Sequence, residues 1–215
     1  PEQGHPMDAL QAAVAALGMF YPGRNVEDLE NNYWSAVRLI AKLPTIVAGW
    51  ARLRRGDDAI APRDELGFSE NFFYMLTETT PHPLLVDIFD DCLILHAEQT
   101  MNASTFTGLV TASTLADPYT VVASSIGALK GPLHGGANEE VVQMLREIGT
   151  PDRAEAYVDE HMRNKRKLMG FGHRVYKNYD PRARIIKQVA EEVFEVTGRN
   201  PKIDIALELE KIALS

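Results

Sequence analysis

Residues 84–99, LLVDIFDDCLILHAEQ, decide the fold class, because their apolar side chains recur at three- and four-residue spacing. Wound as a helix, the segment gathers one broad stripe on a single side, made of Leu85, Ile88, Phe89, Cys92, Leu95 and Gln99. The same spacing continues through most of the chain, and we find no run with the period of two that is typical of a strand. The pattern therefore predicts an all-α, multi-helical fold.

Further helices are expected at 10–19, 33–43, 46–54, 68–79, 181–197 and 203–213, and one more is expected to begin near Asn138. Pro44, Pro62 and the tetrad at 80–83 are predicted to separate the earlier helices, since proline lacks the backbone donor of a helix interior. Three further prolines mark helix starts. Asp117, Thr150 and Asp180 each precede one, and we expect these three side chains to cap the helices that follow.

Composition limits the partners that the chain can take. At 215 residues, 45% hydrophobic and 24% charged, it has the balance of a soluble globular protein, and it has no apolar run near the ~20 residues that span a bilayer. A net charge of −8 argues against broad nucleic-acid binding. Cys92 is the sole cysteine, which favours a reducing, cytoplasmic compartment. The chain begins at Pro1 rather than Met, so we expect a piece of a longer polypeptide.

The strongest internal break is the glycine- and proline-rich stretch 131–136. It predicts that residues 1–135 belong to one helical domain and residues 136–215 to a second.

A positive island lies between Arg163 and Lys187, where nine Lys and Arg accompany the single acid Asp180, a local charge of +8. Such a cluster repels itself, so it predicts an anion site. His173 lies at its centre, directly after Gly172, and Arg182 falls in the first turn of the helix expected after Asp180. There a guanidinium and helix-start N–H groups can converge on a carboxylate. The alternative is a solvated basic loop.

Two other histidines have informative neighbours. His134 lies in Gly-Pro-Leu-His-Gly-Gly, just before an expected helix whose N-terminus would favour a neutral imidazole and stabilise a nearby enolate. The alternative is a hinge histidine that only caps the helix. His96 ends an apolar helix and begins the polar run 96–105, and from the residues alone we favour a satisfied core histidine there.

Other kinds of catalytic site have no support in the sequence. We find no His-Glu-x-x-His or Cys-x-x-Cys metal motif, no Gly-x-Ser-x-Gly nucleophile elbow and no phosphate-binding loop. No bound metal and no tightly bound cofactor are expected.

Two stretches together resemble the signatures of citrate synthases. They are GPLHGGAN at 131–138 and GFGHRVY at 170–176, the latter continuing to Asp-Pro-Arg at 180–182. The run 96–105 resembles a third family segment and His-Pro-Met-Asp at 5–8 also fits, so the resemblance covers essentially the whole chain.

The resemblance implies an all-helical homodimer with a large domain and a smaller mobile one. It also implies condensation of acetyl-CoA, as co-substrate, with oxaloacetate, followed by hydrolysis of citryl-CoA. His134 would hydrogen-bond the acetyl-CoA enolate, and His173 would polarise the oxaloacetate carbonyl. The other residues that it places at the site are His96, Gln99, Asn102 and Arg182 for oxaloacetate, and Leu168, Gly170, Phe171, Gly172 and Lys177 for CoA.

The chain departs from the family pattern in two ways. Gln99 stands where a histidine is frequent, and glutamine donates a hydrogen bond but cannot become cationic. The family's catalytic aspartate and two further substrate arginines would follow Ser215, so we expect these 215 residues alone to be inactive.

Two other functions stay open at this point. One is 2-methylcitrate synthase, which uses propionyl-CoA and differs by room for one methyl group, worth ~1–3 kcal/mol. The other is a non-catalytic helical module that binds anions or partner helices. The apolar helices 84–95 and 121–129 also suggest a dimer interface, unless they simply fill the core of one subunit.

Overall fold

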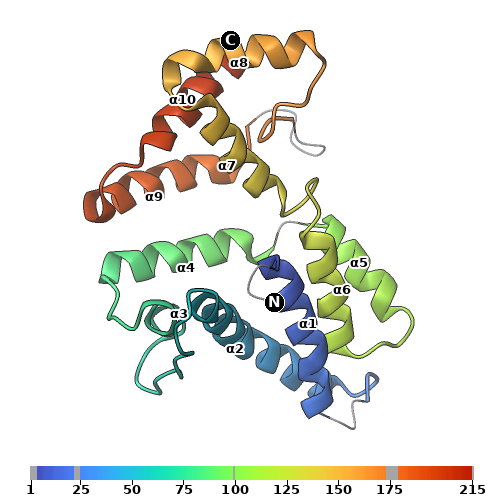
Figure 1. Cartoon of the computed structure of the whole chain (residues 1–215). Coiled ribbons are helices and arrows are strands. Elements are labelled where there is room, and N and C mark those ends of the chain that lie inside the picture. The colour runs from blue at the N-terminus through green and yellow to red at the C-terminus, as the bar shows by residue number, and fades with distance from the viewer. Residues whose placement is uncertain (1–3, 22–24, 99, 173–178, 215) are drawn as a thin grey trace. The chain divides into compact units, whose positions relative to one another are not determined.

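The structure of the chain is a computed structural model. It describes residues 4–21, 25–98, 100–172 and 179–214. Every regular element within these ranges is helical, so the all-α prediction is confirmed. The chain forms two compact units, residues 1–130 and 131–215 (Figure 1). This division falls a few residues before the predicted boundary, and it places His134 in the second unit. The assignment of the units to a large and a small mobile domain stays a prediction.

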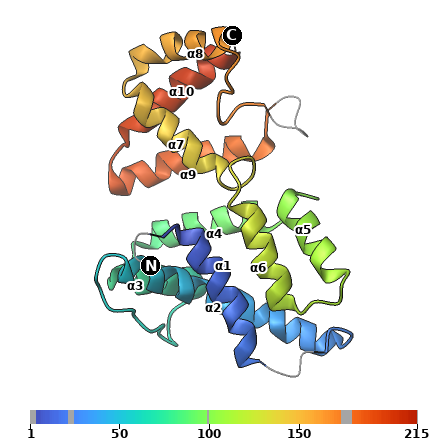
Figure 2. The same cartoon turned by 45° about the vertical axis from the view of Figure 1, so that its right-hand side comes forward.

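The elements of unit 1 are α1 (Pro6–Leu17), η1 (Gly18–Phe20), α2 (Leu29–Leu53), α3 (Phe68–Thr77), α4 (Pro83–Ala97), α5 (Ala103–Ala112) and α6 (Pro118–Leu129). Helices α1, α2 and α5 pack against α6, and α3 packs against α2 and α4. Helix α6 lies between α1 and α5, and α2 also packs against α1 (Figure 2). The buried core consists of Val14, Leu39, Tyr119, Ala123 and Ile126. None of the described helices is long and apolar enough to span a membrane.

Proline at a helix start correctly marked α6 and α9 (Pro181–Thr197). Asp117 Oδ1 accepts the N–H of Tyr119 at 3.0 Å, and Asp180 Oδ1 accepts that of Arg182 at 2.9 Å. The expected cap at Thr150 was wrong, because its side chain makes no capping hydrogen bond. Its carbonyl instead accepts the N–H of Arg153 at 3.1 Å, which closes the short 3₁₀ turn η2 (Pro151–Arg153) ahead of α8 (Ala154–Arg163).

The helix break expected at Pro44 was also wrong, because α2 runs without interruption through it. An internal proline removes one helical hydrogen bond and costs about 3 kcal/mol or more. Burial on both sides of it opposes this cost: Leu39 is 5% exposed and Ala48 fully buried. A fully buried leucine alone contributes roughly 1.5–3 kcal/mol. Tertiary packing therefore holds the two predicted helices together as one.

Unit 2 has a core shared by three helices and one loop. It contains α7 (Ala137–Ile148), η2, α8, α9 and α10 (Pro201–Leu214). The buried core residues are Met144, Leu145, Ile148, Ala154, Ile205 and Leu209, from α7, α8 and α10. Leu168, Met169 and Phe171 pack against them from the loop that joins α8 to α9. This contact fixes one wall of the pocket described next.

Candidate active site

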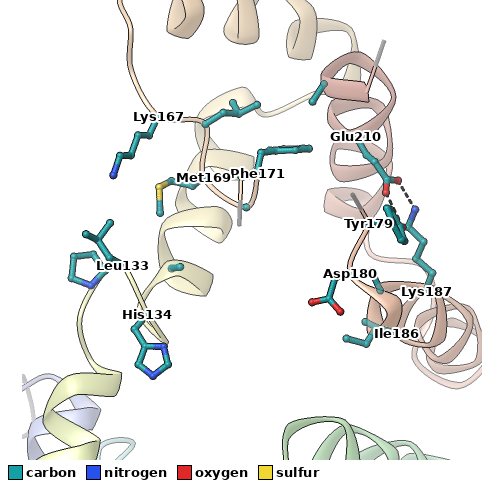
Figure 3. Close-up of a pocket in the computed structure, with 17 residues that line it drawn as sticks. Leu133, His134, Lys167, Met169, Phe171, Tyr179, Asp180, Ile186, Lys187 and Glu210 are labelled. Carbon is teal, nitrogen blue, oxygen red and sulfur yellow. Dashed lines mark hydrogen bonds and ion pairs between the residues drawn. The ribbon is translucent and has the colours of Figure 1, made fainter. Parts of the chain in front are cut away.

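A pocket of about 1110 Å³ lies within unit 2. The residues that line it are Pro132, Leu133, His134, Ala137, Lys167, Leu168, Met169, Gly170, Phe171, Gly172, Tyr179, Asp180, Ala183, Ile186, Lys187, Glu210 and Ala213. Figure 3 shows two facing groups: His134, Leu133, Lys167, Met169 and Phe171 on one side, and Tyr179, Asp180, Ile186, Lys187 and Glu210 on the other. The pocket thus brings together five of the predicted site residues, His134, Leu168, Gly170, Phe171 and Gly172.

His134 is held in a tight turn that leads directly into α7. The Gly131 carbonyl accepts the N–H groups of His134 and Gly136 at 3.0 and 3.1 Å. The His134 carbonyl in turn accepts the N–H of Ala137, the first residue of α7, at 3.1 Å. Backbone carbonyls of the turn therefore satisfy the first N–H groups of α7, and no side chain caps this end. The turn thus places the half-buried imidazole at the pocket, directly before α7.

The loop at 168–172 follows α7 closely because of its first glycine. Gly170 has a φ of +86°, and a Cβ at this position would lie 3.2 Å from Val141 Cγ2 of α7. Both the backbone conformation and the close approach require glycine here. The N–H of Phe171 bonds back to the Leu168 carbonyl at 3.4 Å, and Phe171 packs on the core. The loop backbone is thereby exposed along the pocket.

The substitution Gly170→Ala is expected to destabilise unit 2 by about 1–3 kcal/mol, the usual cost of a non-glycine residue in a sparsely populated backbone region. Urea unfolding of the 215-residue chain measures the change. Gly172→Ala is the matched control, since Gly172 also has a positive φ, +76°, but no atom lies within 4 Å of its Cβ position. Equal losses of stability in Gly170→Ala and Gly172→Ala would contradict the close packing against α7, because the two positions share the positive φ and differ in that contact.

Arg182 does not line the pocket itself but is bound to a residue that does. Its Nε lies 3.2 Å from Asp180 Oδ1 and its Nη2 lies 2.8 Å from Asp180 Oδ2, a bidentate pair. Asp180 Oδ1 also caps α9. One carboxylate therefore fixes both the helix start and the plane of the guanidinium. The Nε and Nη2 donors of Arg182 are thus engaged by Asp180 in the structure.

The predicted island is partly neutralised by acids of the chain. Arg182 pairs with Asp180, and Lys187 pairs with Glu210 of α10. Lys167 is exposed, lines the pocket and makes no ion pair with any residue that the structure describes. A positive side chain thus remains available at the mouth of the pocket for an anionic ligand.

His96 and Asn102 belong to unit 1. Asn102 caps α5, its Oδ1 accepting the N–H of Thr105 at 2.9 Å. His96 is exposed, and its Nδ1 donates to the Cys92 carbonyl at 2.6 Å within its own helix. The core interpretation favoured for this histidine was therefore wrong. In the neutral ring, Nε2 is left as the acceptor.

Three predicted site residues, Gln99, His173 and Lys177, lie outside the described residues. Their roles stay predictions, as do those of the residues in the pocket. In the described ranges, no group of three or more His, Cys, Asp or Glu is arranged to hold a metal ion.

The sequence did not predict the wall of the pocket opposite His134, to which Tyr179, Lys187 and Glu210 belong. Lys187 fell within the positive island but had no role of its own. Glu210 carried no signal, because it is one acid in an ordinary amphipathic helix and its partners are 23 and 31 residues away in the sequence.

The whole chain, residues 1–215, matches the family model described as citrate synthase, C-terminal domain. It is 55% identical over 212 residues to a citrate synthase of Synechocystis sp., a match that covers 99% of this chain and 53% of that protein. A citrate synthase of Acidithiobacillus ferridurans is 50% identical over 220 residues, with 99% and 57% covered. The chain spans about half the length of the curated relatives that it matches.

Two solved structures share the fold over the entire chain. Citrate synthase from Pyrobaculum aerophilum is 45% identical, with a TM-score of 0.86 and 56% of that chain covered. The enzyme from Thermoplasma acidophilum, solved as a ternary complex with carboxymethyl coenzyme A and oxaloacetate, is 31% identical, with a TM-score of 0.88 and 56% covered. Sequence and fold agree over all 215 residues, and the chain belongs to the citrate synthase family.

Proposed function

We propose that the polypeptide containing this chain is a citrate synthase. It condenses acetyl-CoA with oxaloacetate to citryl-CoA and hydrolyses this to citrate and CoA. The observation that carries the proposal is the pocket of unit 2, where His134 and the glycine loop 168–172 face the start of α9. A histidine, exposed loop backbone and a fixed arginine are the groups that an enolate, a CoA and a dicarboxylate require.

In this proposal the chain binds and polarises both substrates. His134 donates a hydrogen bond to the developing enolate oxygen, and the turn at 131–137 holds its ring in place. Arg182 binds an oxaloacetate carboxylate, with Asp180 orienting its guanidinium. His173 polarises the ketone and protonates the new hydroxyl. Loop 168–172 faces the adenine of CoA, while Lys177 and the exposed Lys167 meet its phosphates.

Neither of the two acids that line the pocket is suited to abstract the proton of acetyl-CoA. Both acids that line the pocket are engaged by cations, Asp180 by Arg182 and Glu210 by Lys187. The hydrogen bond from Lys187, together with the one from Tyr179, lowers the pKa of Glu210, which makes this carboxylate a weaker base. The pocket of unit 2 therefore suits substrate binding and polarisation.

The complete polypeptide is expected to release CoA from acetyl-CoA only when oxaloacetate is present, and to form citrate in equal amount. A thiol-reactive dye monitors the free CoA, and kcat/KM for acetyl-CoA is compared with that for propionyl-CoA. We expect the acetyl substrate to be favoured by about 10-fold or more, since one methylene is worth ~1–3 kcal/mol in a fitted pocket. A preference for propionyl-CoA would indicate 2-methylcitrate synthesis, and absence of condensation would reject the proposal.

We further propose a cytoplasmic homodimer. The exposed apolar face of α5 supports an interface, because Phe106, Leu109 and Val110 are 60%, 52% and 53% exposed at helical spacing. Helix α6 contributes to the core of unit 1 instead, since its Ala123 and Ile126 are buried. The single cysteine, Cys92, is compatible with a reducing compartment. Light scattering of the complete protein tests the dimer.

A further inference from the structure

Helix α9, which Asp180 caps and which carries Arg182, is bonded to α10 through a polar contact of Lys187. The apolar core of the unit draws on α7, α8, α10 and the loop at 168–171, and none of its described members comes from α9. Val189 is the one buried residue that the structure describes in α9. Its polar contacts to α10 therefore add to the packing of Val189 in holding the helix.

Glu210 of α10 makes two such contacts at once. Its Oε1 accepts a hydrogen bond from the Tyr179 hydroxyl at 2.9 Å, and its Oε2 accepts one from the Lys187 ammonium (Figure 3). The Lys187 Nζ also lies 5.4 Å from the centroid of the Tyr179 ring, over its face. The three side chains thus form a closed triad. One carboxylate connects α10 to the segment before α9 and to the second turn of α9.

The backbone at Glu210 is itself well fixed. Leu209, its neighbour in α10, is 1% exposed and belongs to the apolar core. The Glu210 side chain is 24% exposed, and that of Lys187 is 46% exposed. The pair is therefore partly shielded from water, with one partner anchored in the core.

The pairing shifts the pKa of both groups. Its hydrogen bond to Glu210 raises the pKa of Lys187 above the ordinary 10.5, and the same contact lowers the pKa of Glu210 below the ordinary 4.5. Both groups are therefore ionised throughout the range in which an enzyme of this family would work.

The triad lies in the wall of the pocket opposite the glycine loop. One wall, the loop 168–171, is fixed to the core by apolar packing. The opposite wall contains Tyr179, Asp180 and Lys187, and Tyr179 directly precedes the helix start that orients Arg182. The contacts of Glu210 therefore connect the start of α9 to α10, whose Leu209 shares the apolar core with the loop 168–171.

We propose that Glu210 is a positioning residue for oxaloacetate binding, acting through Tyr179, Lys187 and the start of α9 on Arg182. The inference rests on the proposed function, because it concerns the same pocket. A partly exposed ion pair contributes little to stability, so an effect on folding is expected to be small. An effect on substrate geometry is expected to be larger, because a displaced binding group can cost a large factor in rate or affinity.

The test measures steady-state kinetics of Glu210→Gln in the complete polypeptide. We expect KM for oxaloacetate to rise about tenfold while kcat changes less than about twofold. Tyr179→Phe, which removes one hydrogen bond and keeps the ion pair, is expected to raise this KM about threefold. The charge-reversed pair Glu210→Lys with Lys187→Glu is expected to restore KM to within about threefold of the wild type, although each single reversal raises it.

Glu208→Gln is the matched control, because Glu208 lies on the same helix, pairs with Lys211 at 3.2 Å and does not line the pocket. Its KM should equal that of the wild type at a similar melting temperature. Equal KM values for Glu208→Gln and Glu210→Gln in an active enzyme would overturn the positioning role alone. A failure of the charge-reversed pair to recover would overturn it as well. An inactive wild type would instead overturn the proposed function and this inference together.

Discussion

Replacing His134 with alanine in the complete polypeptide is expected to lower kcat by about 10³-fold, because one preorganised donor to an oxyanion is worth roughly that factor. The turn at 131–137 is closed by backbone hydrogen bonds, so removal of the ring should leave it in place. The expected loss is therefore one of chemistry at a folded site. Citrate formation and the melting temperature are measured on the same preparation.

His161→Ala provides the control for this experiment. His161 also lies in unit 2, where its ring stacks on Tyr157 at 4.0 Å between centroids, but it does not line the pocket. Its replacement should leave kcat within about twofold of the wild type. His173→Ala is expected to match the loss of His134→Ala, since general acid catalysis contributes about 10²–10⁴-fold. Unchanged rates in both His134→Ala and His173→Ala would remove the basis of the enzyme assignment.

Replacing Arg182 with alanine is expected to raise KM for oxaloacetate about 100-fold. A hydrogen-bonded charge pair is worth about 1.5–3 kcal/mol, and each 1.4 kcal/mol is a factor of ten. Arg182→Lys should recover only part of this, because lysine keeps the charge and lacks the planar fork that Asp180 orients. Isothermal titration of oxaloacetate and initial rates give independent values.

The neighbouring Arg184 tests whether this effect belongs to one position. Arg184 is exposed on the same helix and does not line the pocket. Arg184→Ala removes the same charge from the same positive island. If general attraction of the anion explained binding, both variants would raise KM alike, and the specific role of Arg182 would be rejected.

Helix starts show how far the sequence could be interpreted locally. Asp117 and Asp180 were recognisable because a short acid before proline satisfies a specific backbone donor. His5 and His82 precede proline in the same way, and each imidazole accepts a backbone N–H at 3.2 Å. They were missed because histidine is not among the usual capping residues. The pattern of a polar acceptor before proline was nevertheless present at both positions.

Features that depend on distant neighbours could not be predicted in this way. Pro44 carries a local signal for a break, and only the burial of Leu39 and Ala48 shows why α2 continues. His96 was favoured for a core because its segment is apolar, yet the ring is exposed and bonded to its own helix. In the pocket, His134 and the glycine loop were visible as local motifs. The opposite wall depends on contacts of Glu210 across tens of residues.

The weak apolar attachment of α9 also links ligand binding to the order of the helix. Segments with few buried side chains are the ones that open locally at low cost, and Val189 is the one buried residue described in α9, so we expect this helix to open before α7, α8 and α10. A ligand that contacts both walls binds only when this segment is in place, so it raises the free energy of opening the segment by RT ln(1 + [L]/Kd). At a concentration of 100 Kd this is about 2.7 kcal/mol. The substrate concentration would then determine the fraction of molecules in which α9 is in place.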